Sequence, residues 1–140
     1  MVELNGICAL PAGYAAGNSA AVNGNSLATT NVTDGQVLPF SAVNCAALSR
    51  VLAPVLSKDA GAHRDFLYGR AMARVVAHEM YHVLMRTTEH ARAGIARSCF
   101  SIEDLVAERF EFEATVLARM RRKPDSVSAN TIAAEDASDR

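Results

Sequence analysis

The feature that most constrains this 140-residue chain is a pair of histidines four positions apart, His78 and His82, with Glu79 directly after the first. An α-helix has about 3.6 residues per turn, so the two imidazoles would lie on one face, one turn from each other. This H-E-x-x-H spacing lets both rings bind a single Zn²⁺. Glu79 would lie about 100° around the helix from His78, beside the ion, where a general base is needed.

The residues around the motif have the pattern of a helix. Apolar side chains recur at helical spacings before the motif and continue after it. They are Phe66, Leu67, Ala71, Met72, Val75, Val76, Val83, Leu84 and Met85. No proline or glycine lies between residues 70 and 90, so we expect a helix of about 18–20 residues. The alternative without a metal is a surface pair of histidines, with Glu79 in a salt bridge to an arginine.

A third ligand has to come from outside this helix. His90 follows His82 by eight residues, which on a continuous helix would place it about 12 Å further along the axis. The chain must therefore turn back between Arg86 and His90. Thr87 and Thr88 favour a helix end there, because they are poor helix formers whose hydroxyls can bond to nearby backbone.

Two alternatives to His90 remain open. One is a glutamate of the last helix, Glu108 or Glu111, as in gluzincin peptidases. The other is a site of two histidines completed by water or substrate. A carboxylate in the last helix can equally be solvated or paired with an arginine.

Residues 69–105 resemble a known group of proteins. The run G-R-A-M-A-R-V-V-A-H-E-M-Y-H-V-L-M-R-T-T-E-H, followed by G-I-A-R-x-x-F-x-x-x-D-L, is similar to small bacterial zinc metallopeptidases of the zincin type. Metzincins read H-E-x-x-H-x-x-G-x-x-H, whereas here the third histidine lies two residues later and that glycine is absent. Similar proteins often have G-I-M or G-V-M where this chain has Gly94-Ile95-Ala96. The resemblance implies His90 as the third ligand.

Composition narrows the class of protein. Half of the residues are hydrophobic and 21% are charged, as in an ordinary globular protein. The net charge of −1 gives no reason to expect nucleic acid or a membrane surface as a partner. No apolar run is long enough to span a bilayer, and no secretory signal is visible. Because similar proteins are often exported, an extracytoplasmic location stays open if the start is truncated.

The three cysteines, Cys8, Cys45 and Cys99, show no C-x-x-C spacing. Their odd number allows at most one disulfide. We expect buried free thiols instead, since cysteine is often buried as a small apolar residue.

A β-hairpin is predicted in the first third of the chain. Residues 1–25 are rich in Ala, Gly and Asn and have weak local preferences. Residues 27–32 and 37–43 then flank Asp34-Gly35, a two-residue signature of a type I′ turn. Pro39 cannot donate to a ladder, which predicts an edge strand or a bulge there. In zincins an extended substrate pairs with an edge strand above the active-site helix; the alternative is a purely structural hairpin.

Two helices are predicted on either side of the motif. Asn44 is placed to cap a helix that begins at Cys45, and Pro54 should kink or end it near Ala53. Residues 57–63 are expected to form a loop around Gly61, with His63 exposed and not a ligand.

Ser101 and Asp104 resemble a capping box. They predict a helix that runs to about Arg122 and ends before Pro124. Its acidic start and basic end suit the helix dipole.

These elements predict an α+β fold: a small zincin-like domain with a short N-terminal β-hairpin or sheet and three main helices. Residues 1–123 would form one metallopeptidase domain, with residues 1–25 poorly defined, and residues 124–140 a disordered tail.

The predicted function is zinc-dependent hydrolysis of a peptide or protein, with Glu79 as general base and His78, His82 and His90 as ligands. Tyr81 is expected to pack in the core. The alternatives are a non-catalytic zinc domain and a helical interaction module without metal.

Overall fold

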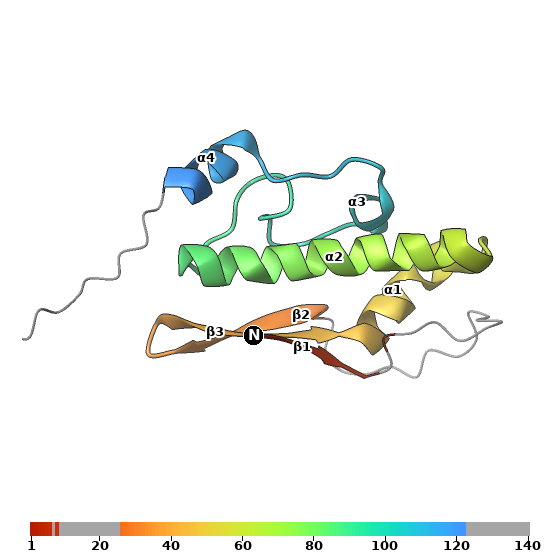
Figure 1. Cartoon of the computed structure of the whole chain (residues 1–140), viewed down its shortest axis with the longest axis horizontal. Helices are drawn as coiled ribbons and strands as arrows, with labels where there is room; N and C mark the ends of the chain where they lie inside the picture. The colour runs from red at the N-terminus through yellow and green to blue at the C-terminus, as the bar shows by residue number, and fades with distance from the viewer. Residues whose placement is uncertain (7, 9–25, 123–140) are drawn as a thin grey trace, which may run out of the picture.

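The computed structural model describes residues 1–6, 8 and 26–122. Its elements are β1 (Val2–Asn5), β2 (Ala28–Thr33), β3 (Gln36–Asn44), α1 (Cys45–Leu56), α2 (Gly61–Met85), α3 (Ile102–Val106) and α4 (Ala114–Arg122). The predicted α+β class is confirmed. The sheet lies along one side of α2 (Figure 1). Helices α3 and α4 lie along the other side, together with the loop that follows α2 (Figure 1). The predicted tail, residues 124–140, lies outside the described residues.

The sheet has the strand order β1-β3-β2, with β1 parallel and β2 antiparallel to β3. The predicted hairpin joins β2 to β3. Its two turn residues, Asp34 and Gly35, have φ values of 49° and 74°, both positive as a type I′ turn requires.

Pro39 lies in an irregular part of the sheet, although β3 as a whole is the central strand. Thr30 pairs with Ser41 and Val32 with Val37, so the register of β2 against β3 shifts across the stretch that contains Pro39. On its other side, β3 pairs with β1 only from Ser41 onward. The missing N–H of Pro39 is therefore accommodated by a local irregularity, and the edge strands are β1 and β2.

Helix α1 begins where the sequence predicts and ends later. The Asn44 side chain accepts a hydrogen bond from the N–H of Ala47 at 2.9 Å, and the helix starts at Cys45. Of the two effects predicted for Pro54, a kink or an end near Ala53, the end is wrong, because α1 includes Pro54 and runs to Leu56. Leu56 is completely buried, so packing holds the last turn around the proline.

Helix α2 is 25 residues long and begins at Gly61, earlier than predicted. His63 lies in its first turn rather than in a loop; its side chain is 64% exposed, as expected, and pairs with Asp59. The helix ends at Met85, and Arg86 caps it in the left-handed conformation with a φ of 47°. The predicted reversal between Arg86 and His90 is confirmed.

The core lies between the sheet, α1, α2 and α3. Its buried residues are Val43, Leu48, Leu52, Leu56, Leu67, Tyr68, Ala71, Val75 and Leu105. A second, smaller cluster of Tyr81, Ala96 and Val116 joins the last part of α2 to the loop and α4. Tyr81 is 2% exposed and packs in the core, as predicted. None of the helices in the described residues is long and apolar enough to cross a membrane.

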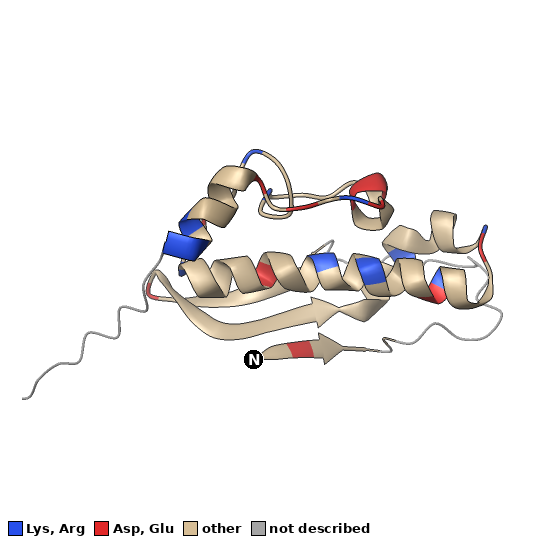
Figure 2. Ribbon diagram, turned by 45° about the horizontal axis from the view of Figure 1, so that its top comes forward, with Lys and Arg blue, Asp and Glu red and all other residues tan. Residues whose placement is uncertain are grey.

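The single long helix predicted from Ser101 to Arg122 is wrong, although its capping box is present. The Ser101 hydroxyl accepts the N–H of Asp104, and the Asp104 carboxylate accepts the N–H of Ser101. Helix α3 stops at Val106, and α4 begins only at Ala114. The acidic start therefore belongs to α3 and the basic end to α4 (Figure 2).

Two arginines of α2 account for the break. The Arg74 guanidinium donates hydrogen bonds to the carbonyls of Asp104, Leu105 and Ala107, and Arg70 donates to Val106 and Ala107. These carbonyls would otherwise accept the next intrahelical bonds. Because Arg74 is only 7% exposed, it fixes the end of α3 inside the protein.

A disulfide joins Cys8 to Cys45, and the expectation of free thiols is wrong for this pair. Asn5 of β1 pairs with Asn44 of β3, so the chain after β1 passes beside the start of α1. Cys8 and Cys45 are therefore brought together by strand pairing, which the spacing of the cysteines in the sequence does not reveal. Cys99 is a free thiol, and it is exposed.

Candidate metal centre

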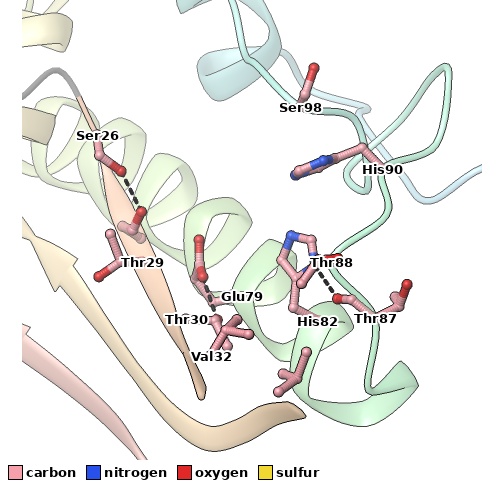
Figure 3. Close-up of a pocket in the computed structure, with 12 residues that line it drawn as sticks. Ser26, Thr29, Thr30, Val32, Glu79, His82, Thr87, Thr88, His90 and Ser98 are labelled. Carbon is pink, nitrogen blue, oxygen red and sulfur yellow. Dashed lines mark hydrogen bonds between the residues drawn. The ribbon is translucent and has the colours of Figure 1, made fainter. Parts of the chain in front are cut away.

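The structure brings His78, His82 and His90 together. Each histidine offers one ring nitrogen, and the three nitrogens lie within 4.8 Å of one another. His78 and His82 are buried on α2, and His90 reaches the same place from the loop after it; Figure 3 shows the rings of His82 and His90 approaching from these two sides. The His90 ring stacks on that of His78, with 5.3 Å between centroids.

Backbone carbonyls fix the orientation of both buried histidines. Nδ1 of His78 lies 2.7 Å from the carbonyl oxygen of Ile95, and Nδ1 of His82 lies 2.7 Å from that of Thr87. A carbonyl only accepts hydrogen bonds, so both Nδ1 atoms carry the proton. The hydrogen bond from Nδ1 to a carbonyl selects, in each ring, the tautomer in which Nε2 is free to bind a metal.

The two Nε2 atoms face each other at 3.0 Å. A neutral imidazole has one N–H, and in both rings it is already donated from Nδ1. Two lone pairs would then oppose each other in a buried site, an arrangement that a cation between them relieves. Burial lowers the pKa of His78 from its ordinary value, and it does the same for His90. Neutral imidazoles are the form that binds Zn²⁺, so the residues present fit this ion.

The loop that carries Ile95 is held by Gly94. The φ of Gly94 is +69°, and a Cβ there would lie 2.4 Å from the carbonyl oxygen of Glu111. Gly94 forms an isolated antiparallel β-bridge with Phe112. The N–H of Ile95 donates a hydrogen bond to the carbonyl of Glu111. Only glycine permits this close approach at a positive φ.

Glu79 lies beside the histidines and is 6% exposed. Its Oε2 accepts a hydrogen bond of 2.5 Å from the Thr30 hydroxyl of β2 (Figure 3). Among the ion pairs of the described residues none involves Glu79, so the surface salt bridge of the metal-free alternative is not formed.

Two cavities meet at Glu79. One, of about 290 Å³, is also lined by His82, His90 and residues of β2 that include Thr30 and Val32. The other, of about 260 Å³, is lined by His78 and by apolar residues such as Val75 and Phe100. Glu79 and all three histidines therefore each line at least one of the two cavities.

The glutamates considered as third ligands lie elsewhere. Glu108 and Glu111 are exposed. Among the described residues, the three histidines are the only group of three or more His, Cys, Asp or Glu side chains that could hold a metal ion. Sequence reasoning missed Thr30 and the carbonyls of Thr87 and Ile95. The alternation of side chains along β2 places Thr30 on the same face of the strand as Ala28. That pattern does not indicate that Thr30 contacts Glu79.

The described residues thus form an α+β domain with a cluster of three histidines beside a buried glutamate. Comparison with models of protein families, with curated proteins and with solved structures gave no match. A function is therefore inferred from the residues of the site.

Proposed function

We propose that this protein is a zinc-dependent peptide hydrolase in which His78, His82 and His90 hold the metal and Glu79 is the general base. The observation that carries the proposal is the convergence of three imidazole nitrogens within 4.8 Å, two of them on rings whose other nitrogen is bound to a carbonyl. A buried carboxylate beside such a cluster is what metal-assisted hydrolysis needs.

His78, His82 and His90 would hold the zinc ion, which when bound would lower the pKa of a water molecule to about 7 and would supply positive charge for the developing oxyanion. Glu79 removes a proton from the attacking water as the new C–O bond forms at the peptide carbonyl. It then delivers that proton to the amine as the C–N bond breaks. Its burial limits the water around the carboxylate, so its charge acts more strongly there than it would in bulk water.

The substrate that fits this site is a peptide in an extended conformation. Strand β2 is an edge strand, and Thr29, Thr30 and Val32 of this strand line the cavity that contains Glu79. An extended peptide can add to such an edge through backbone hydrogen bonds, which would carry its carbonyl past the histidines.

Zinc analysis of the purified protein together with hydrolysis of a quenched-fluorescence peptide library tests the proposal. We expect about one zinc per chain, and loss of zinc in His78→Ala and His82→Ala. His63→Ala is the matched control, because His63 is exposed and pairs with Asp59 away from the cluster. Wild-type zinc content in both cluster variants would refute the metal site.

The Glu79→Gln variant separates catalysis from metal binding. We expect it to keep its zinc and to lower hydrolysis by about 10²-fold or more, the scale of general-base catalysis. A zinc-loaded wild type that cleaves nothing in the library would instead favour the non-catalytic zinc domain.

A further inference from the structure

We propose that Thr30 is a positioning residue for Glu79 and that Ser41 holds Thr30 in turn; this rests on the function proposed above. The Thr30 hydroxyl lies 2.5 Å from Oε2 of Glu79, and the Ser41 hydroxyl lies 2.8 Å from that of Thr30. The chain of hydroxyls thus runs from the central strand, through the edge strand, to the helix.

The direction of these hydrogen bonds follows from the donors present. The Thr30 hydroxyl donates to Oε2 of Glu79, and a hydroxyl has a single proton to donate. The Ser41 hydroxyl must then donate to Thr30. Ser41 is 4% exposed, which limits its contact with water, and among the described residues its hydroxyl has Thr30 as its partner.

The backbone keeps both hydroxyls facing α2. Thr30 and Ser41 are paired across β2 and β3, at the last pair before the register shifts. Residues opposite each other in an antiparallel pair point to the same face of the sheet. The contact is thus fixed by strand pairing and is not a chance meeting of flexible side chains.

The consequence for Glu79 is a restricted carboxylate. A glutamate side chain has three rotatable bonds, and a misplacement of about 1 Å in a catalytic group can lower the rate about 10²-fold. Thr30 occupies Oε2. The other carboxylate oxygen accepts no hydrogen bond from the described part of the chain, so it is available to a water molecule in the cavity.

The first test compares Thr30→Val, Thr30→Ser and Thr33→Val in the zinc-loaded protein. Valine has the shape of threonine without its hydroxyl, so we expect kcat to fall about 10- to 100-fold with KM and zinc content within about twofold of wild type. Serine restores the hydroxyl and should restore most of kcat. Thr33 is exposed on the same strand, and Thr33→Val should resemble wild type. Wild-type kcat in Thr30→Val would overturn the proposal.

The second test uses the metal-free protein and needs no activity. Thr30→Val should lower the melting temperature by about 3 °C or more, because a buried carboxylate loses its donor. In a Glu79→Ala background the same change should cost clearly less, because only the Ser41 hydroxyl then loses its partner. Equal losses in both backgrounds would overturn the contact. An inactive wild type with intact coupling would overturn the hydrolase function, and with it the catalytic role of Thr30, while leaving the contact established.

Discussion

Nδ1 of His78 is hydrogen bonded to the backbone carbonyl of Ile95, seventeen residues further along the chain, at 2.7 Å. The orientation of a candidate ligand on α2 thus depends on a loop outside that helix. Gly94, next to Ile95, packs that loop against the backbone of residues 111–113.

Gly94→Ala should damage both the fold and the metal site. The positive φ and the contact of 2.4 Å between the new Cβ and the Glu111 carbonyl oxygen should lower the free energy of unfolding by at least about 2 kcal/mol. Urea unfolding of the metal-free protein measures this. Gly69→Ala is the control: a Cβ there meets nothing within 4 Å, and in a helix it should stabilise by about 0.5–1 kcal/mol. A stabilising Gly94→Ala would contradict the close packing.

His90 is expected to be the third ligand. Its replacement by alanine should weaken zinc binding by more than about 100-fold, beyond the loss seen when a supporting contact of a ligand is removed. Glu108→Ala and Glu111→Ala should bind zinc as the wild type does, because both residues are exposed and outside the cluster. Competition against a chelating dye gives the three affinities. If His90→Ala bound zinc as tightly as the wild type and one of the two glutamate variants bound it more weakly, that glutamate and not His90 would be the third ligand.

Arg74→Met should destabilise the protein by about 3 kcal/mol or more, since it leaves the carbonyls of Asp104, Leu105 and Ala107 without their buried donor. Urea unfolding with circular dichroism detection measures the change. Arg92→Met, at an exposed position, should alter stability by no more than about 0.5 kcal/mol. Similar values for the two variants would mean that Arg74 does not hold the end of α3.

Reduction of the Cys8–Cys45 disulfide should lower the free energy of unfolding by about 3–4 kcal/mol, because it releases a loop with a sequence separation of 37. Urea midpoints with and without dithiothreitol measure the loss. Cys8→Ser should show the reduced stability under both conditions. Cys99→Ser should respond to dithiothreitol as the wild type does, since Cys99 is free.

Acid should remove the stabilisation that Asp104 provides. Desolvation raises the pKa of Asp104, but hydrogen bonds from Ser101 and the charge of Arg97 outweigh it and bring the pKa below 3.8. A lowered carboxyl pKa stabilises the fold above its unfolded-state value, and this contribution is lost as the pH falls through the folded-state value. The difference in unfolding free energy between wild type and Asp104→Asn should be constant above about pH 5 and shrink below about pH 4. A difference that grows in acid would contradict the assignment.

The sequence predicted those parts of the fold that neighbouring residues determine. The type I′ turn needs only Asp34 and Gly35, the start of α1 needs the Asn44 cap, and the histidine spacing needs one uninterrupted helix. Each of these is decided within a few residues, where propensity and capping act.

Three features that were missed depend on residues far apart in the chain. The break after α3 comes from Arg74, and the disulfide comes from the pairing of β1 with β3. At the site, the three histidines were predicted, whereas the contact of Thr30 with Glu79 required knowing which face of the sheet lies against α2. No local pattern carries that information.

The two parts of the candidate site, the three histidines and Glu79, depend on contacts of different separation along the chain. The histidines all come from residues 78–90, and the turn at Arg86 brings them near one another within this short stretch. Glu79 relies on Thr30, 49 positions away, and such a contact is made only after a long loop has closed. If the proposed function holds, loosening of the sheet should free Glu79 before it separates the three histidines, so that a partly unfolded molecule would still bind metal after it has lost the geometry for catalysis.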